Sequence, residues 1–460
     1  MISPSDARVF DANSESLGIS VDDLMLNAGR ALADVVSRFA EGKKVLFVCG
    51  SGNNGGDGYA AASILGADAV RLSEPKTKAA RKRMEEMTGR VQDYENGCIR
   101  EYGVIVDCAL GTGIRGTPRG IYASFIEELN SSDKFVISAD VPSGFGTELG
   151  VRPDVTVAFH DLKTGMDEKI CGKMIVADIG IPREAVLFIG PGDIGRYPIP
   201  REDSHKGDNG RVLVIGGGPY TGAPAIAASA ALRTGCDLVR IASPKQSAST
   251  IAAMSPSFMV TELSCKSLCR KDLSKLSDLC GTTDAVLIGP GIGPGAPSRG
   301  AAAEFISACR TPMVIDADGI NAIAGKAVRF SAPVVLTPHK GEMTRLLGRE
   351  PDDAGVMAFA KETGSVVLLK GREDMITDGV RIRYNRTGCP GMTAGGTGDA
   401  LAGSVAGLMS KGMEAFDAAC LAAYICGLAG EHAFRKFSYG MTATDMVESI
   451  PRVLKRCLKK

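Results

Sequence analysis

Tryptophan is absent from the chain, and phenylalanine and tyrosine together supply only 5% of its residues. Platforms that stack nucleic-acid bases depend on such side chains, so this class of protein is disfavoured. A charge surplus is also lacking, because Lys plus Arg and Asp plus Glu number 53 each. Without a basic excess, we expect neither nucleic acid nor a membrane surface as a partner.

Long apolar runs and metal-ligand spacings are missing as well. The first residues contain no apolar segment of the signal-peptide kind, and the uncharged stretch 418–430 is too short to span a bilayer. We therefore expect a cytoplasmic protein. None of the thirteen cysteines form a Cys-x-x-Cys pair, and the four histidines are not paired at ligand spacing. This favours buried free thiols over disulfides or a zinc site.

The residues that are present predict two α/β domains. The chain has 460 residues, of which 44% are hydrophobic and 23% charged, which is too long for one ordinary domain. Short apolar strands alternate with helical stretches, and this alternation predicts parallel sheets with helices on their faces. The non-periodic, proline-containing stretch at about 190–205 is interpreted as a linker, which divides the chain into domains 1–200 and 201–460.

Individual elements follow from periodicity and turn signals. An amphipathic helix is expected over 20–39, where Ser20 and Asp23 have the spacing of a capping box. Asp378-Gly379 predicts a hairpin turn. In the first domain strands are expected at 45–49, 103–107, 135–140 and 155–159. In the second domain strands are expected from 211 and at 238–241, 285–288, 313–316, 334–337, 366–370, 375–377 and 380–383, with helices over 224–233, 399–410 and 414–434.

Polar loops follow three of the first-domain strands. Gly50-x-Gly52-x-x-Gly55 matches a dinucleotide fingerprint, but a dehydrogenase would need an acidic residue near Arg71. The next two strands end at Asp107 and Asp140, each followed by a glycine-containing turn. Parallel strands present such loops at one sheet edge, where ligands bind. A tight strand–helix turn or helix caps would be the purely structural explanation.

The second domain carries a glycine-rich segment before a helix, 388–399. Backbone N–H groups at such a helix start favour an anion, and a carboxylate there can take a hydroxyl proton during phosphoryl transfer. Lys370, at a strand end, suits phosphate as a point charge, although a solvated strand end is an equal alternative. His339 and Gly293 also lie in loops that follow strands.

Together these segments resemble a known pair of domains. Asn53-Asn-Gly-Gly-Asp57, Asp107-x-x-x-Gly-Thr-Gly113 and Asp140-x-Pro-Ser143-Gly are similar to the NAD(P)H-hydrate epimerase domain. The motifs 203–207, 222–224, 337–342 and 395–399 are similar to the ADP-dependent NAD(P)H-hydrate dehydratase. The whole chain thus resembles the bifunctional NAD(P)H-hydrate repair enzymes, which implies a Rossmann-like three-layer domain followed by a ribokinase-like α/β domain.

The resemblance also implies site residues. In the epimerase domain, Asp140 is the candidate acid/base, and Asn54, Asp107 and Ser143 would bind K⁺, for which oxygen ligands are suited. The NAD(P)H hydrate would contact Asn53, Asn54, Gly55, Gly56, Asp57, Gly111, Thr112, Gly113, Ile114, Arg115, Gly116, Thr117 and Asp140. The family usually has a glutamate where this chain has Leu26, which places any role of that glutamate in doubt.

In the dehydratase domain Asp399 is the candidate catalytic base. The hydrate would contact Ala225, Gly293, His339 and Asp399. ADP, with Mg²⁺, would contact Lys370, Gly371, Arg372, Glu373, Asp374, Gly395, Gly396, Thr397 and Gly398. The residues do not decide between ADP and ATP, or between the NADH and NADPH hydrates. A homo-oligomer is expected from the family alone.

Two other interpretations remain open. One is a ribokinase-type small-molecule kinase with a regulatory nucleotide-binding N-terminal domain. The other is a non-enzymatic interaction module, against which the retained Asp107, Asp140 and Ser143 argue.

Overall fold

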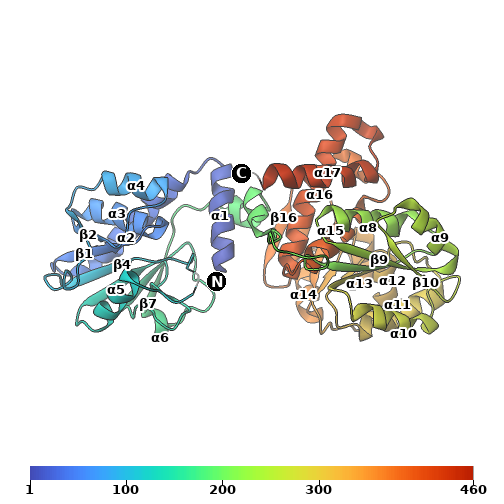
Figure 1. The fold of residues 1–460 in the computed structure, drawn as a ribbon, viewed down its shortest axis with the longest axis horizontal. Helices are drawn as coiled ribbons and strands as arrows, with labels where there is room; N and C mark the ends of the chain where they lie inside the picture. Colours follow the sequence, from blue (N-terminus) through green and yellow to red (C-terminus); the bar gives the residue numbers. More distant parts are fainter. Residues whose placement is uncertain (115, 459–460) are drawn as a thin grey trace. The chain divides into compact units, whose positions relative to one another are not determined.

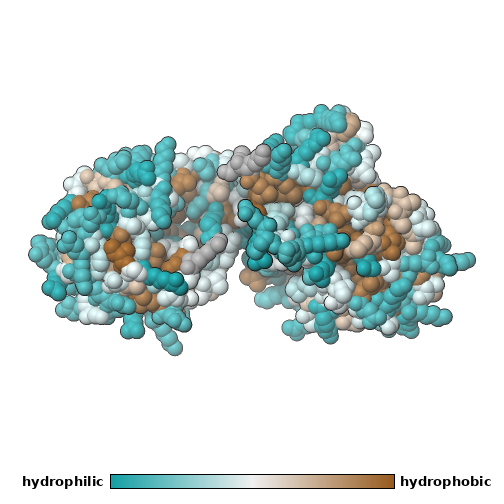
Figure 2. Space-filling view, viewed as in Figure 1, coloured by the Kyte–Doolittle hydropathy of each residue, from teal (hydrophilic) through white to brown (hydrophobic). Residues whose placement is uncertain are grey.

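The computed structural model describes residues 1–114 and 116–458, which form two compact units, Met1–Ala185 and Val186–Lys460 (Figure 1). Each unit is a sheet covered on both faces by helices, so the predicted α/β fold is confirmed. On the face seen in Figure 2, hydrophilic side chains dominate and hydrophobic ones form separate patches. Within the described part of the chain, no helix is long and apolar enough to cross a membrane.

The first unit contains a seven-stranded parallel sheet in the order β3-β2-β1-β4-β5-β6-β7. Its strands are β1 (Val45–Cys49), β2 (Asp68–Arg71), β3 (Val91–Asp93), β4 (Val104–Cys108), β5 (Phe135–Ala139), β6 (Val155–Phe159) and β7 (Lys173–Ala177). Its helices are α1 (Pro4–Ser16), α2 (Val21–Ala40), α3 (Asn53–Leu65), α4 (Lys78–Glu85), α5 (Ile121–Asn130) and α6 (Glu168–Cys171), and α7 (Arg183–Leu187) runs across the division.

Alternation along the strands builds the three layers of this unit. In β1, Phe47 and Cys49 face the core formed with α2 and α3, whereas Leu46 and Val48 face the core formed with α5. The α2 helix begins at Ser20, whose side chain accepts from the Asp23 backbone N–H in the predicted capping box.

Glycines let helix α3 approach the sheet closely. A Cβ on Gly55 would lie 2.1 Å from the Gly50 carbonyl oxygen, and one on Gly58 would lie 2.7 Å from the Cys108 side chain. The strand order reverses between β1 and β4, and the polar loops after both strands therefore meet at this switch point.

The second unit contains a nine-stranded sheet in the order β10-β9-β8-β11-β12-β13-β14-β15-β16, in which β14, β15 and β16 are antiparallel neighbours. Its strands are β8 (Arg211–Ile215), β9 (Leu238–Pro244), β10 (Met259–Leu263), β11 (Ala285–Ile288), β12 (Met313–Ile315), β13 (Val334–Leu336), β14 (Val366–Leu369), β15 (Asp374–Thr377) and β16 (Ile382–Asn385).

Helices cover both faces of this sheet. They are α8 (Gly222–Arg233), α9 (Lys245–Met254), α10 (Leu273–Cys280), α11 (Ala296–Ala308), α12 (Asp318–Ile323), α13 (Lys340–Leu347), α14 (Asp353–Thr363), α15 (Thr397–Ser410), α16 (Ala415–Phe437) and α17 (Ala443–Cys457), with 3-10 turns η1 (Pro191–Arg196), η2 (Arg270–Asp272), η3 (Pro390–Thr393) and η4 (Ser438–Gly440). One core joins the sheet to α8, α15, α16 and α17, and the other joins it to α11, α12, α13 and α14.

The structure differs from the expected domain boundary. The units divide after Ala185 rather than near residue 200. Much of the stretch interpreted as a linker belongs to the second unit, because Ile189 and Ile194 are buried in its core and the Asp193 carboxylate pairs with Arg383 at 3.1 Å. Sequence periodicity could not reveal this, since a short 3-10 turn buries only isolated side chains.

The expected hairpin also differs in its turn. Its second strand begins at Ile382, not at Val380. The Asp378 carboxylate accepts from the backbone N–H groups of Val380 and Arg381, at 2.9 and 2.7 Å, and so extends the turn by two residues.

Candidate active sites

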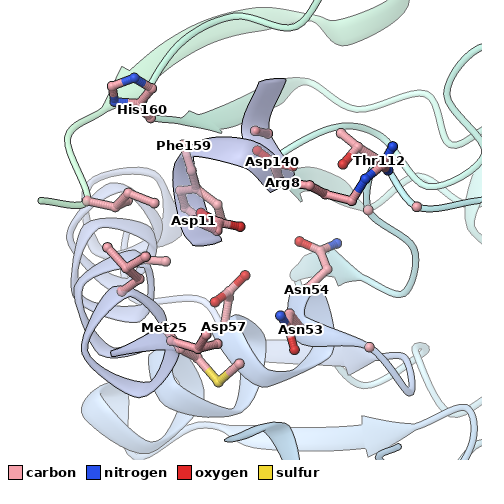
Figure 3. Close-up of a pocket in the computed structure, with 18 of the residues that line it drawn as sticks. Arg8, Asp11, Met25, Asn53, Asn54, Asp57, Thr112, Asp140, Phe159 and His160 are labelled. Carbon is pink, nitrogen blue, oxygen red and sulfur yellow. The ribbon is translucent and has the colours of Figure 1, made fainter. Parts of the chain in front are cut away.

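A cavity of about 500 Å³ opens at the switch point of the first unit. Its wall combines the loops after β1, β4, β5 and β6 with side chains from α1 and α2 (Figure 3). One part is apolar, supplied by Val21, Leu24, Met25, Ile179 and Ile181. Carboxylates and amides occupy another part, so the cavity fits a ligand with an apolar ring and polar groups.

Most of the predicted epimerase residues meet in this cavity. Those that line it are Asn53, Asn54, Asp57, Gly111, Thr112, Gly113, Ile114 and Asp140. Gly55 and Gly56 instead pack inside α3, against Gly50 and Met25. Gly116 and Thr117 are not part of the lining, and Arg115 lies outside the described residues.

Asn54 and Leu110 line the cavity, and behind Leu110, whose N–H donates to the Ser143 hydroxyl at 2.7 Å, Ser143 is hydrogen-bonded to Asp107. Asp107 is fully buried and accepts from the Ser143 hydroxyl at 2.5 Å, the Ser143 N–H at 2.8 Å and the Ser138 hydroxyl at 2.9 Å. Burial nevertheless raises the Asp107 pKa. The Asn54 side-chain amide is buried, and among the described residues neither its oxygen nor its nitrogen has a hydrogen-bond partner. A buried side-chain amide without a hydrogen-bond partner fits a ligand that the protein itself does not supply.

Asp140 follows β5 with a positive φ of 63°, which is rare for a residue with a Cβ. Its carboxylate is ion-paired with Lys163, whose side chain is only 2% exposed. In the same cavity, burial and the negative charge of Asp140 raise the pKa of Asp11 to about 6 and that of Asp57 well above its usual range. The site therefore holds an ion pair beside two carboxyls that retain protons more readily than usual.

Sequence reasoning missed Asp11, Arg8 and Lys163. Helix α1 brings Arg8 and Asp11 to the cavity (Figure 3), and its start carries a capping box of Ser3 and Asp6 that could have predicted the helix. No local signal distinguishes Lys163 from other loop lysines.

The α2 helix contributes Leu24, Met25 and Ala28 to the cavity wall, but Leu26 is not part of it. The neighbouring Asn27 donates to the Ile179 carbonyl at 3.0 Å, which attaches α2 to the loop after β7.

In the second unit, the glycine-rich segment turns into helix α15 at Gly396, which has a φ of 96°. Asp399 lies in the first turn of this helix, and its pKa is raised to about 7 by burial and by the carboxylate of Asp316, against the opposing effect of Lys370. A carboxyl with a pKa near neutrality is matched to proton transfer.

Lys370 connects this helix start to the sheet. Its ammonium lies 2.9 Å from the Asp316 carboxylate, which also accepts from Thr337 at 2.8 Å. Burial lowers the Lys370 pKa, but the charges of Asp316 and Glu342 outweigh it and the net shift is upward. A Cβ on Gly398 would lie 3.3 Å from this ammonium, so the cation lies beside the predicted anion site.

His339 caps helix α13, accepting from the Gly341 N–H at 3.0 Å, and its backbone pairs with that of Lys370. Gly293 donates its N–H to Asp318 at 2.8 Å. Ala225 is buried in α8, the helix that packs against α15, and Ile226 beside it lies 2.7 Å from where a Gly396 Cβ would be. The structure thus gathers His339, Lys370, Gly398 and Asp399 around one point.

The other predicted nucleotide contacts have structural partners of their own. Asp374 closes the turn by accepting from the Gly371 N–H at 3.0 Å, and exposed Glu373 pairs with Arg386. Arg372 is exposed, as is Gly395, whereas Thr397 donates to the Met392 carbonyl at 2.7 Å. Asp316 was not predicted as a site residue, although it ends a predicted strand.

These features define an enzyme of two α/β units: an acid–base pocket at the switch point of the first, and a cation, carboxylates and a glycine-rich helix start in the second. Residues 21–165 match the model of the YjeF-related protein N-terminus, and residues 212–452 match that of NAD(P)H-hydrate dehydratase.

Relatives and solved structures agree with these matches. The bifunctional NAD(P)H-hydrate repair enzymes of Archaeoglobus fulgidus and Methanocaldococcus jannaschii are 41% and 33% identical over 99% of this chain, covering 99% and 94% of their own lengths. The ADP/ATP-dependent NAD(P)H-hydrate dehydratase of Bacillus subtilis, co-crystallised with ATP and Mg²⁺, has a TM-score of 0.53 and 26% identity, covering 59% of this chain and 99% of its own. The chain therefore belongs to the bifunctional NAD(P)H-hydrate repair enzymes, which join an epimerase to a dehydratase.

Proposed function

We propose that the cavity of the first unit interconverts the R and S hydrates of NAD(P)H at nicotinamide C6. An acid gives a proton to the C6 hydroxyl, the C6–O bond breaks, water leaves, and the ring nitrogen lone pair stabilises the resulting cation. Water then adds to the opposite face while a base takes its proton. The observation that carries this assignment is the ion-paired Asp140 beside Asp57 and Asp11, whose pKa values are raised.

Substrate contacts in this cavity are proposed for the lining residues. Asn53, Asp57 and the loop 111–114 present amide, carboxyl and backbone groups, and the apolar wall from α2 suits the face of the reduced ring. Gly55 and Gly56 act through the close packing of α3. Gly116 and Thr117 remain proposed contacts from the family resemblance alone.

A potassium ion is proposed for Asn54, Asp107 and Ser143. The unpaired Asn54 amide oxygen, the buried Asp107 carboxylate and the Ser143 hydroxyl are hard oxygen donors. A bound cation would supply positive charge for the buried carboxylate and hold the Asn54 loop. The readout independent of turnover is thermal stabilisation of the protein by K⁺ that Asn54→Ala removes.

The second unit is proposed to dehydrate the S hydrate by phosphoryl transfer. Hydroxide is a poor leaving group, so transfer of the terminal phosphoryl group of ADP to the C6 hydroxyl lets phosphate leave with the C–O bond. The balanced outcome is NAD(P)H, AMP and phosphate. Asp399 takes the hydroxyl proton, Gly395 to Gly398 and Lys370 hold phosphates, and positioning supplies most of the rate.

The remaining contacts in this unit are proposals from the resemblance and the loop positions. Ala225, Gly293 and His339 are assigned to the hydrate, and 371–374 to ADP. Magnesium would be held chiefly by the nucleotide phosphates. The carboxylates around Lys370 are the protein oxygens available to complete its coordination.

The decisive experiment mixes the protein with hydrated NADH and ADP and follows the return of reduced-nicotinamide absorbance together with AMP and phosphate. A stable phosphorylated product without NADH would favour the ribokinase-type kinase instead. A cytoplasmic homo-oligomer is proposed as well, and light scattering that gives a monomer at micromolar concentration would contradict the oligomer.

A further inference from the structure

Lys163 is a charged side chain buried in the wall of the epimerase cavity. Its side chain is 2% exposed, and its ammonium donates to the Asp140 carboxylate and, at 2.7 Å, to the Phe159 carbonyl. Burying an ammonium costs several kcal/mol unless an opposite charge and hydrogen bonds compensate it. The position of Lys163 is therefore tied to the charge of Asp140.

Asp140 itself is held in an unusual conformation. Its φ of 63° directs the chain sharply away from the end of β5, and its N–H donates to the Val157 carbonyl at 2.8 Å on the neighbouring strand. Such a backbone costs about 1–3 kcal/mol and persists where the surroundings over-determine it. The hydrogen bond from Lys163 constrains the side chain of Asp140, so both the backbone and the carboxylate of Asp140 are oriented.

The loop that carries Lys163 is itself well anchored. The Lys163 carbonyl accepts from the Met166 N–H at 3.1 Å. On either side of Lys163, the Leu162 carbonyl accepts from Ile2 at 2.8 Å and the Thr164 N–H donates to Ile2 at 2.9 Å. The ammonium is thus presented from a fixed backbone rather than from a mobile surface loop.

The charges facing Asp140 come from several elements. Asp57 projects from α3, Asp11 and Arg8 from α1, and Lys163 from the loop after β6 (Figure 3 shows all but Lys163 labelled). The negative charge of Asp140 raises the pKa values of Asp57 and Asp11, and the positive charge of Lys163 opposes both effects. Lys163 thereby offsets a concentration of negative charge that would otherwise repel within the cavity.

We propose that Lys163 is a positioning residue of the epimerase: its ion pair orients the Asp140 carboxylate toward the substrate, and it acts on the reaction through Asp140. This role differs from that of a structural ion pair, which would support folding without affecting turnover. It rests on the proposed role of Asp140, so the experiment separates the two.

The test replaces Lys163 by Met, which keeps its length and removes its charge, in the full chain. We expect the epimerase kcat to fall by about 30–100-fold with KM within about threefold, because a misoriented base affects the transition state more than binding. The dehydratase rate on the pure S hydrate, measured in the same sample, should be unchanged. Lys169→Met, which removes an exposed lysine from the following helix, is the matched control and should leave both rates unchanged.

The double variant Lys163→Met/Asp140→Asn decides how Lys163 acts. If it acts through Asp140, the double variant should be no more than about threefold slower than Asp140→Asn alone. A loss equal to the product of the two single losses overturns the proposal, as does a wild-type kcat in Lys163→Met or a loss confined to KM.

Hydrogen exchange of the β4 and β5 peptides checks that each variant is correctly folded. If Lys163→Met loses protection in these peptides, the charge-neutral double variant is compared with Asp140→Asn instead. Equal epimerase rates in these two variants support the proposal, and a rate a further tenfold lower in the double variant refutes it. An Asp140→Asn enzyme with full epimerase activity would overturn the role of Asp140 itself, a result distinct from failure of the Lys163 proposal.

Discussion

The two units solve the removal of one hydroxyl in different ways. Each places a lysine–aspartate ion pair at the carboxyl edge of a sheet, Lys163 with Asp140 and Lys370 with Asp316. In the first unit Asp140 itself has a positive φ, and in the second Ala317, which follows Asp316, does. Each pair lies beside two further carboxyls with raised pKa values, Asp11 and Asp57 in the first unit and Glu342 and Asp399 in the second, and the first unit adds an apolar wall. The second adds a glycine-rich helix start.

The comparison shows that similar ion pairs at the carboxyl edges of two sheets suit different chemistry when the surrounding groups differ. Carboxyls with raised pKa values suit proton transfer to and from a hydroxyl, which is sufficient for reversible epimerisation. Backbone N–H groups at a helix start favour phosphate, which suits the proposed transfer of a phosphoryl group from a nucleotide to the hydroxyl.

The largest effect is expected from Asp399→Asn in the second unit. Loss of the base should lower NADH formation from the S hydrate by about 10³-fold, within the range for a positioned acid–base group. ADP binding, measured by calorimetry, should be near normal, because glycine N–H groups and Lys370 carry the phosphates. Normal turnover would remove Asp399 as the base, and release of intact ADP with NADH would refute phosphorylation.

The corresponding change in the first unit is Asp140→Asn. Chromatography of the two hydrates should show interconversion slowed by about 10²-fold, because the proposed acid–base group is lost. The same sample should dehydrate the S hydrate at the wild-type rate. Consumption of the R hydrate at the wild-type rate would show that the acid–base contrast between the units is wrong.

A stability measurement sharpens the comparison through Asp11. Its pKa is about 6 in the folded protein against 3.8 for the free group, so well below pH 3.8 both states are protonated and the shift costs no stability. As pH rises from 4 to 6 the unfolded chain ionises first and the folded unit loses about 2–3 kcal/mol. Asp11→Asn should therefore stabilise the first unit above pH 6 and have only a small effect near pH 4.

Hydrogen exchange of α1–α3 peptides in urea measures this change for the first unit alone. Asp34→Asn, at an exposed position on α2, is the control. Equal stabilisation by Asp11→Asn at pH 4 and pH 7 would contradict the charge-burial explanation.

Potassium dependence should distinguish the units more modestly. Replacing K⁺ by tetramethylammonium should slow the epimerase by about tenfold, because a bulky cation cannot enter the oxygen site near Asn54. Asn54→Ala should make the enzyme insensitive to this exchange. Epimerase activity that is indifferent to the cation would exclude the proposed site.

The smallest effect is expected from Leu26→Glu, which restores the residue usual in the family. Because Leu26 is not part of the cavity wall, the epimerase rate should change by less than about threefold. A large gain would mean that the wall contributed by α2 rearranges during turnover.

Much of this protein follows from local sequence. Apolar strands ending at Asp107 and Asp140, glycine loops before helices, and the capping box at Ser20 predicted the sheets, most of their strands and the position of Asp399 at a helix start. These features depend on backbone propensity, on the periodicities of strands (two residues) and helices (about four residues), and on the spacing of a capping box. All of these can be seen directly in a sequence.

Only tertiary structure decided which charges meet. Lys163 reaches Asp140 across 23 residues, Lys370 reaches Asp316 across 54, and Asp11 enters the cavity from a helix whose partners lie on distant loops. Ion pairing and burial depend on distance in space, which strand order and backbone angles such as the φ of Asp140 establish after folding. The sequence by itself determined the chemical groups and the sheet edges at which they lie. Packing alone determined their pKa shifts and ion-pair partners, because desolvation and Coulomb interactions act between neighbours in space.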